Sequence, residues 1–318
     1  MFLQGGAASV LPVEGDPAMF DALSTEATRP ELADFDLWTT IDSVRVFADD
    51  QRDVAAVVRD AAASIAVAVD AIADQMTVGG RLIYVGAGTG GRMAAVDAAE
   101  IGPSYGLPGR VIAVLAGGLE GFTEGREYYE DLASAGAADV GILDPGPDDV
   151  VFGISASGCT PYVLGGIAAA RAAGSLTIGF ACTVRSELGA ASDLAIEVAT
   201  GAEIIAGSTR LKAGTAQKCV LNAISTLVMV KLGRTYGNLM IDAVADNAKL
   251  RRRALRVVVQ ATGVDDARAA AVLDEAGGSA KVAVVAVLAG VSTKRAEEVL
   301  RAAAGQVRYA VSLADVRD

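Results

Sequence analysis

Residues 81–92 constrain the fold more than any other stretch of this sequence, because they join a buried strand to a glycine turn and a helix. The run 82–85 is apolar and rich in β-forming residues, which is typical of a strand buried on both faces. Four glycines follow it (Gly86, Gly88, Gly90 and Gly91), and a helical pattern then occupies 92–96. Such a turn directs backbone N–H groups and a helix N-terminus toward one point, which favours a bound anion, most often a phosphate.

The glycine turn has other interpretations. The glycines also allow a strand and a helix to pack closely without binding anything, and on this stretch alone that alternative stays open. No Gly-Lys-Ser/Thr follows, so the turn is not a Walker A loop. The spacing of Gly86, Gly88 and Gly91 fits a dinucleotide site, but no acidic residue closes the next predicted strand, so this interpretation is weak.

Strand and helix patterns alternate through the middle of the chain. Further strands are predicted at 111–115, 150–154, 176–182 and 194–198. Helices are predicted at 51–78, 123–137 and 162–173. This alternation predicts an α/β fold, a three-layer α-β-α domain with a five-stranded parallel sheet, in which ligands bind at the carboxyl ends of the strands.

The two ends of the chain follow other patterns. A loose arm up to about residue 24 precedes a helix that begins with a capping motif near Thr40. Helical patterns fill the region after residue 200, at 212–232 and 241–261 and in a small three-helix module at 265–275, 279–290 and 293–304. We therefore predict three parts: an N-terminal arm and helix (1–50), the α/β domain with its leading helix (51–240) and a C-terminal helical region (241–318).

Composition excludes several classes of function. The net charge of −12 disfavours nucleic acid or an anionic membrane surface as a partner. No signal peptide is recognisable, and the longest charge-free apolar run, 282–291, is too short to span a bilayer. Three cysteines without metal-type spacing predict reduced thiols and a cytoplasmic protein. The absence of histidine removes Ser-His-Asp and Cys-His systems, so acid–base chemistry falls to carboxylates, lysine, tyrosine or cysteine.

A second loop, 155–160, follows the strand predicted at 150–154. It places the hydroxyls of Ser155, Ser157 and Thr160 beside Gly158 at the start of a helix. Hydroxyls and backbone amides together can bind phosphate oxygens without a cation. The alternative is that Ser157 or Thr160 only caps the helix, which needs a single such residue. We therefore favour a phosphate site.

Five blocks of sequence resemble the sugar isomerase (SIS) family and, within it, the N-acetylmuramic acid 6-phosphate etherases. The blocks are Gly86-Ala87-Gly88-Thr89-x-Gly91-Arg92, Asp97-Ala98-x-Glu100, Ala156-Ser157-Gly158-x-Thr160-Pro161-Tyr162-Val163, the run 207–218 (Gly-Ser-Thr-Arg-Leu-Lys-Ala-Gly-Thr-Ala-Gln-Lys) and Tyr236-Gly237-Asn238-Leu239-Met240. The resemblance extends from Thr25 to about residue 308, and the tail resembles the ubiquitin-associated-like module that ends these etherases.

The resemblance implies cleavage of the lactyl ether of N-acetylmuramic acid 6-phosphate to D-lactate and N-acetylglucosamine 6-phosphate, in recycling of cell-wall amino sugars. It maps the family's proton donor onto Glu100 and its C2 base onto Glu130. Glu127, three residues before Glu130, competes for the second role. Elimination followed by hydration needs two carboxylates and no metal or organic cofactor.

The resemblance and the two loops together give the expected binding residues. They are Gly88, Thr89, Gly90, Ser155, Ser157, Thr160, Ser208, Thr209 and Lys212. Lys212 supplies positive charge in this interpretation, and the alternative is a surface lysine. Three positions depart from the family: Gly90 replaces a serine, Cys159 replaces an arginine, and Ile101-Gly102 replaces Cys-Pro.

Two other classes remain open from the sequence: another SIS phosphosugar isomerase or lyase, and a non-catalytic phosphosugar sensor. The absence of histidine disfavours the isomerases, and the presence of Glu100 and Glu130 favours an enzyme. We also expect a homodimer, because the helix at 212–232 is apolar on most of its circumference. In that dimer the segment 207–218 would lie close to the partner's loops at 86–92 and 155–160.

Overall fold

The computed structural model describes residues 23–124, 127–243 and 248–315. These residues form two compact units, one containing the chain up to Ala98 together with Arg110–Ser225, the other containing Ala99–Gly109 together with the chain from Thr226. The predicted division at about residue 240 stays a prediction. In the described ranges, no helix combines the length and the apolar character needed to cross a membrane.

The first unit is built on a five-stranded parallel sheet, as predicted. Its strands are β1 (Leu82–Gly86), β2 (Val111–Leu115), β3 (Val150–Ser155), β4 (Leu176–Ala181) and β5 (Leu194–Glu197). Their order in space is β2-β1-β3-β4-β5. After β1 the chain continues to β2 on one side, and after β3 it continues to β4 on the other side. The register places Gly86 between Leu115 and Ile154. The loops after β1 and β3 therefore lie side by side at the switch point of the sheet, where such folds bind ligands.

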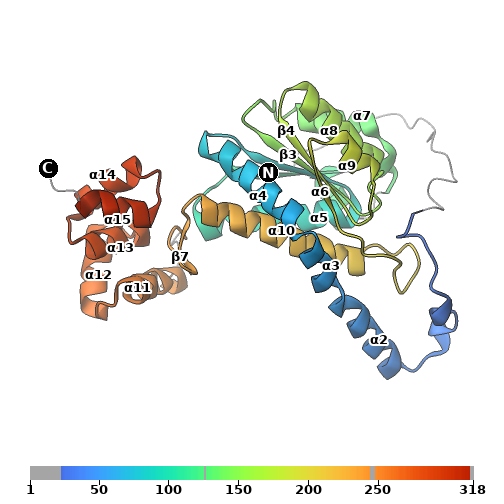
Figure 1. The fold of residues 1–318 in the computed structure, drawn as a ribbon, viewed down its shortest axis with the longest axis horizontal. Helices are drawn as coiled ribbons and strands as arrows, with labels where there is room; N and C mark the ends of the chain where they lie inside the picture. The colour runs from blue at the N-terminus through green and yellow to red at the C-terminus, as the bar shows by residue number, and fades with distance from the viewer. Residues whose placement is uncertain (1–22, 125–126, 244–247, 316–318) are drawn as a thin grey trace. The chain divides into compact units, whose positions relative to one another are not determined.

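Helices cover both faces of this sheet (Figure 1). One face carries α7 (Ala133–Gly141), α8 (Pro161–Ala172) and α9 (Glu187–Ala191), and the other carries α4 (Ala62–Thr77), α5 (Gly88–Tyr105) and α10 (Lys212–Lys231). Residues Ile83, Val85 and Val151 of the strands pack with Val163 and Ile167 of α8 on the first face. Both faces are buried, which explains why the strands are apolar throughout rather than alternating.

Two buried polar contacts tie α5 and α10 to the sheet. Tyr84, in β1, donates its hydroxyl hydrogen to Asp97 of α5 at 3.0 Å. Ser225 of α10 donates to the other oxygen of the same carboxylate at 3.0 Å. Burial, and secondarily the nearby charge of Asp97, raises the pKa of Tyr84 well above its ordinary value, so this tyrosine stays a donor. The helix that begins at the glycine turn is thereby fixed in position.

Helix α8 is held by an unusually close contact with α7. A Cβ atom added at Gly136 would overlap the carbonyl oxygen of Tyr162, and one added at Gly165 would overlap that of Ala133. The two backbones touch because these glycines have no side chains. Tyr162 also donates its hydroxyl to Asp139 of α7 at 2.6 Å. The start of α8, which follows the 155–160 loop, is rigidly placed as a result.

Two predicted helices are broken in the structure. The helix expected at 51–78 is divided into α3 (Val54–Asp60) and α4, after the separate α2 (Thr40–Arg52). The helix expected at 123–137 is wrong: the chain forms α6 (Gly118–Thr123), the 3₁₀ helix η3 (Glu127–Asp131) and then α7. Tyr129 of η3 packs against the core between the sheet and α8. This packing outweighs the helix propensity of the charged residues around it.

The second unit is helical, as expected. It contains a short hairpin of β6 (Thr235–Tyr236) and β7 (Leu239–Met240), then α11 (Ala248–Thr262), α12 (Asp266–Glu275), α13 (Ala280–Ala289), α14 (Thr293–Ala302) and α15 (Val307–Asp315). Val258, Val284 and Val285 are among its fully buried core residues. The predicted three-helix module corresponds to α12–α14, and α15 was not predicted.

Candidate active site

A pocket of about 610 Å³ opens at the carboxyl end of the sheet. Loops from four parts of the chain contribute to its wall: the segment at 23–26, the turn after β1, the loop after β3 and the segment at 207–210. The 3₁₀ helix η3 closes a further side. All of these parts belong to the first unit. The pocket therefore lies at the switch point of the sheet, as the order of the strands requires.

The glycine turn combines close packing with a position in the pocket wall. A Cβ atom at Gly86 would lie 2.8 Å from the Cα of Gly91, so these two glycines allow the strand and the helix to pack closely. Gly88, Thr89 and Gly90 instead line the pocket at the first turn of α5. The unpaired backbone N–H groups of that turn are available to an anion in the pocket. The helix begins earlier than its pattern predicted, inside the turn itself.

The 155–160 loop forms a connected cluster of hydroxyls. Ser155 Oγ lies 2.7 Å from Thr160 Oγ1 and 3.2 Å from Ser157 Oγ. It also accepts a hydrogen bond from the N–H of Gly158 at 2.9 Å. All three hydroxyl residues line the pocket. Thr160 occupies the N-cap position of α8, but its side chain makes no capping hydrogen bond. The capping interpretation therefore does not explain Thr160.

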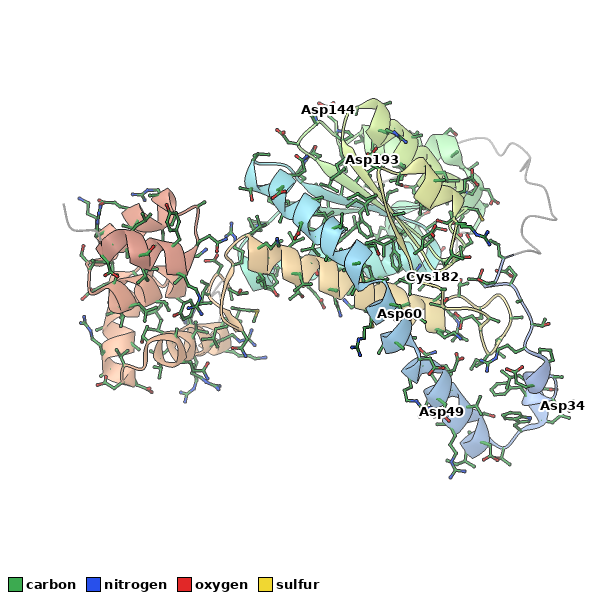
Figure 2. The ribbon with its side chains drawn as sticks, viewed as in Figure 1. Asp34, Asp49, Asp60, Asp144, Cys182 and Asp193 are labelled. Atoms are coloured by element: carbon green, nitrogen blue, oxygen red, sulfur yellow. The ribbon has the colours of Figure 1, made fainter. Side chains whose placement is uncertain are left out.

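The cysteines near the site are poor nucleophiles. Cys159, inside the hydroxyl loop, donates its thiol to Ser157 Oγ at 3.3 Å, and burial raises its pKa. Cys182, labelled in Figure 2, follows β4, and its thiol lies 3.6 Å from the carbonyl oxygen of Ala213 in α10. Burial raises its pKa as well. Both thiols are thus held in the neutral form at ordinary pH.

Glu130 lies in the pocket wall, carried by η3. Its Oε1 approaches the start of α5 so closely that a Cβ atom at Gly88 would lie only 2.6 Å away. Gly88 has a φ of +50°, which a residue with a side chain adopts rarely. Tyr128 and Asp131 line the pocket beside it. The side chain of Glu127, the competing candidate, lies outside the described residues.

The segment 207–210 completes the wall of the pocket from the same chain. Gly207 donates its N–H to the carbonyl of Thr25 at 3.3 Å, and a Cβ atom at Gly207 would lie 2.7 Å from Glu26 Oε2. Ser208, Thr209 and Arg210 line the pocket. These first residues of the 207–218 segment line the same pocket as the loops at 86–92 and 155–160 of their own chain. The expected approach of this segment to the loops of a partner stays a prediction.

Lys212, expected to supply positive charge to the site, is not among the residues that line the pocket. Its Nζ donates to Asp50 Oδ1 and to the carbonyl oxygen of Ala202, both at 3.0 Å. Arg29 contacts the same carboxylate oxygen at 2.7 Å. The backbone N–H of Lys212, and that of Ala213, are capped by the buried carboxylate of Glu203 at 2.9 and 2.8 Å. Lys212 is thus a structural residue at the start of α10, because an ion pair holds its ammonium inside the protein.

Glu100 is also absent from the lining of the pocket. It is exposed and lies on α5, the helix that begins at the pocket with Gly88. The rise of an α-helix places it about 18 Å along the axis from that glycine. Within the first unit, the structure brings Glu130 to the pocket together with the hydroxyl loop and the glycine turn, and Glu100 belongs to the second unit.

Six polar residues of the pocket were not predicted as site residues: Glu26, Arg92, Tyr128, Asp131, Arg210 and Gln217. Three of them stand inside blocks that carried the family resemblance, which was the available signal. Arg92 donates to the carbonyl oxygens of Gly121 at 2.9 Å and Phe122 at 3.2 Å, so much of its hydrogen-bonding capacity serves α6. In the described part of the chain, no group of three or more Cys, Asp or Glu residues is arranged to hold a metal ion.

Comparison with known proteins identifies the relatives of the chain. Residues 64–171 match the model of the glucokinase regulatory protein N-terminal SIS domain. The N-acetylmuramic acid 6-phosphate etherase of Rubrobacter xylanophilus is 51% identical over 91% of this chain and 96% of its own length. The etherase of Streptomyces coelicolor is 45% identical over 93% of this chain and 96% of its own length.

Among solved structures, a phosphoheptose isomerase from Francisella tularensis aligns with a TM-score of 0.48 and 15% identity. The alignment covers 61% of this chain and 100% of that one.

Proposed function

Because this chain belongs to the family of N-acetylmuramic acid 6-phosphate etherases, we propose that it cleaves the lactyl ether of N-acetylmuramic acid 6-phosphate. The products are D-lactate and N-acetylglucosamine 6-phosphate, so the protein is a carbon–oxygen lyase of amino-sugar metabolism. The observation that carries the proposal within the structure is the pocket itself, where the carboxylate of Glu130 lies beside the first turn of α5 and the hydroxyl loop lines the same pocket.

The substrate's own chemistry sets what the pocket must do. In the open-chain sugar, the C1 aldehyde makes the proton on C2 acidic, and the lactyl oxygen on C3 is in the position of a leaving group. A base removes the C2 proton, the C2–C3 double bond forms, and the C3–O bond breaks as an acid protonates the departing oxygen. Water then adds back across the double bond. We assign the base to Glu130.

The phosphate is proposed to bind between the glycine turn and the hydroxyl loop. Ser155, Ser157 and Thr160 can turn their hydroxyl hydrogens from each other toward the phosphate oxygens. The N-terminal turn of α5 supplies backbone N–H groups and its dipole. This arrangement suits a chain with a net charge of −12, because it binds an anion with few cations. Ser208 and Thr209 extend the polar wall.

The proton donor is proposed to be Glu100, as the family resemblance implies. Glu100 does not line the pocket of its own chain, and we propose that a second copy of the chain brings its Glu100 there. A homodimer is supported by an exposed apolar surface around α2, formed by Leu37, Ile41, Val44 and Phe47. Exposed apolar surface of this kind marks an interface. A cytoplasmic location stays a prediction.

The test is incubation of the purified protein with N-acetylmuramic acid 6-phosphate and enzymatic measurement of released D-lactate. We expect release by the wild type and a loss of at least about a thousandfold in Glu130→Gln, because the amide cannot accept the C2 proton. Glu124→Gln, in the same charged stretch but outside the pocket, is the control and should keep wild-type activity. Full activity of Glu130→Gln would contradict the assignment of the base.

A second candidate function is phosphosugar sensing without catalysis. The match of residues 64–171 to the SIS domain of glucokinase regulatory protein favours it. The same assay separates the two functions, because a sensor binds the phosphosugar and releases no lactate.

A further inference from the structure

Gln217 is a nearly buried amide that the fold itself does not use. It lies on α10, is 1% exposed and lines the pocket. Its Oε1 is buried without a hydrogen-bond partner among the described residues. Buried polar groups in native proteins are almost always paired, so an amide with an unpaired atom in a pocket wall is a candidate for binding a ligand.

The amide lies against the first turn of α5. A Cβ atom at Gly90 would be 3.2 Å from Gln217 Nε2, and Gly90 itself lines the pocket. The first turn of a helix is where an anion is stabilised by unpaired N–H groups and by the helix dipole. A donor beside that turn is therefore placed where an oxyanion would bind. The absence of a side chain at Gly90 keeps the approach open.

The helix that carries Gln217 is fixed at several points. Glu203 caps the start of α10 through two backbone N–H groups, at 2.9 and 2.8 Å. Lys212 anchors the same turn to Asp50, and Ser225 ties the helix to Asp97 further along. A side chain on such an element is held in one position before any ligand arrives, which is what a specific contact needs.

We propose that Gln217 is a substrate-binding residue, whose Nε2 donates to an oxyanion held at the N-terminus of α5. The identity of the oxyanion rests on the proposed function, which offers two: the 6-phosphate and the lactyl carboxylate.

The proposal is tested with Gln217→Met, which keeps the side-chain volume and removes both polar atoms. Affinity for N-acetylglucosamine 6-phosphate and for inorganic phosphate, measured by calorimetry, should fall about tenfold if the phosphate is the partner. If the lactyl carboxylate is the partner, these affinities stay constant, and affinity for D-lactate and kcat/KM for the etherase substrate fall instead. The melting temperature should stay equal or rise, because an unpaired buried amide is removed.

The control is Asn222→Ala, which removes an exposed amide from the same helix outside the pocket and should change neither affinity nor activity. A Gln217→Met protein that loses thermal stability while all ligand affinities and kcat/KM stay at wild-type values would overturn the proposal. If the wild type binds N-acetylglucosamine 6-phosphate but releases no lactate, the proposed function is overturned. The proposal for Gln217 is still tested in that case, because the effect of Gln217→Met on phosphosugar affinity is measured without turnover.

Discussion

At the scale of single residues, the hydroxyls of the 155–160 loop hold one another in a chain of short contacts, with Ser155 in the middle. Ser157 and Thr160 stand at the two ends of this chain. An end residue satisfies part of its hydrogen-bonding capacity within the cluster and has the rest available for a ligand. These two side chains are therefore the ones to change in testing where the phosphate binds.

Ser157→Ala and Thr160→Ala should each weaken binding of N-acetylglucosamine 6-phosphate by about tenfold or more, because a hydrogen bond to a charged oxygen contributes roughly 1.5–3 kcal/mol. Binding of unphosphorylated N-acetylglucosamine should change little. Calorimetry with both sugars measures the difference. An equal loss for the two sugars would indicate that the hydroxyls only support the local backbone.

Residues in motifs next to strands were predictable as pocket residues, and residues whose side chains turn inward on a helix were not. The order of the strands alone places Gly88, Ser155 and Thr160 at one edge of the sheet. Lys212 and Gln217 stand on the same helix, and only packing decides that the lysine turns to Asp50 and the glutamine to the pocket. Spacing along the sequence does not contain that information.

At the scale of elements, the starts of β1 and β3 are joined by one ion pair. Asp149, just before β3, accepts from the backbone N–H of Arg81 at 2.7 Å and from its guanidinium at 2.6 and 3.1 Å. A fourth hydrogen bond comes from the N–H of Gly146 at 3.1 Å. Burial alone would raise the pKa of Asp149, but the hydrogen bonds from Arg81 and Gly146 lower it overall.

Asp149→Asn should lower the free energy of unfolding at pH 7 by roughly 2–3 kcal/mol, because one buried partner of a charged pair is lost. A carboxyl whose pKa is lowered in the folded state stabilises the protein above its unfolded pKa, and this contribution disappears as pH falls through the folded value. The difference in the free energy of unfolding between Asp149→Asn and the wild type should therefore narrow below about pH 4.

Urea unfolding at pH 7 and pH 3 measures this difference, and the exposed neighbour Asp148→Asn is the matched control. A difference in unfolding free energy of the same size at pH 7 and pH 3 would mean that the charge of Asp149 does not contribute to stability.

The strands were predicted to within about a residue, because five apolar runs of this length admit few alternatives. The region between β2 and β3 was predicted wrongly. The charged residues there have high helix propensity whether or not the chain forms a helix. Tyr129 packs into the core and imposes a 3₁₀ turn, and this turn is what carries Glu130 to the pocket. Glu130, the proposed base, thus lies in η3, an element that the sequence did not predict.

At the scale of the whole molecule, the two proposed catalytic carboxylates call for two chains. We expect light scattering to report twice the chain mass of 32.1 kDa. Glu100→Gln and Glu130→Gln should each be inactive alone. Mixed and allowed to exchange subunits, they should regain about a quarter of wild-type lactate release, because half of the dimers are mixed and each mixed dimer has one intact site.

A mixture that stays inactive while subunit exchange is demonstrated by mass would mean that both carboxylates act within one chain. A fully active monomer would exclude a shared site in any form.

The carboxylates of Glu26, Glu130 and Asp131 around the pocket also bear on how a ligand arrives. A phosphosugar with a lactyl group has the same sign of charge as the protein, whose net charge is −12. At 0.01 M ionic strength the repulsion extends over about 30 Å, and at 0.1 M over about 10 Å. Encounter therefore speeds up as salt is added, until other anions compete for the hydroxyl loop. The ionic strength of the surroundings thus sets the rate of capture, with a maximum at intermediate salt.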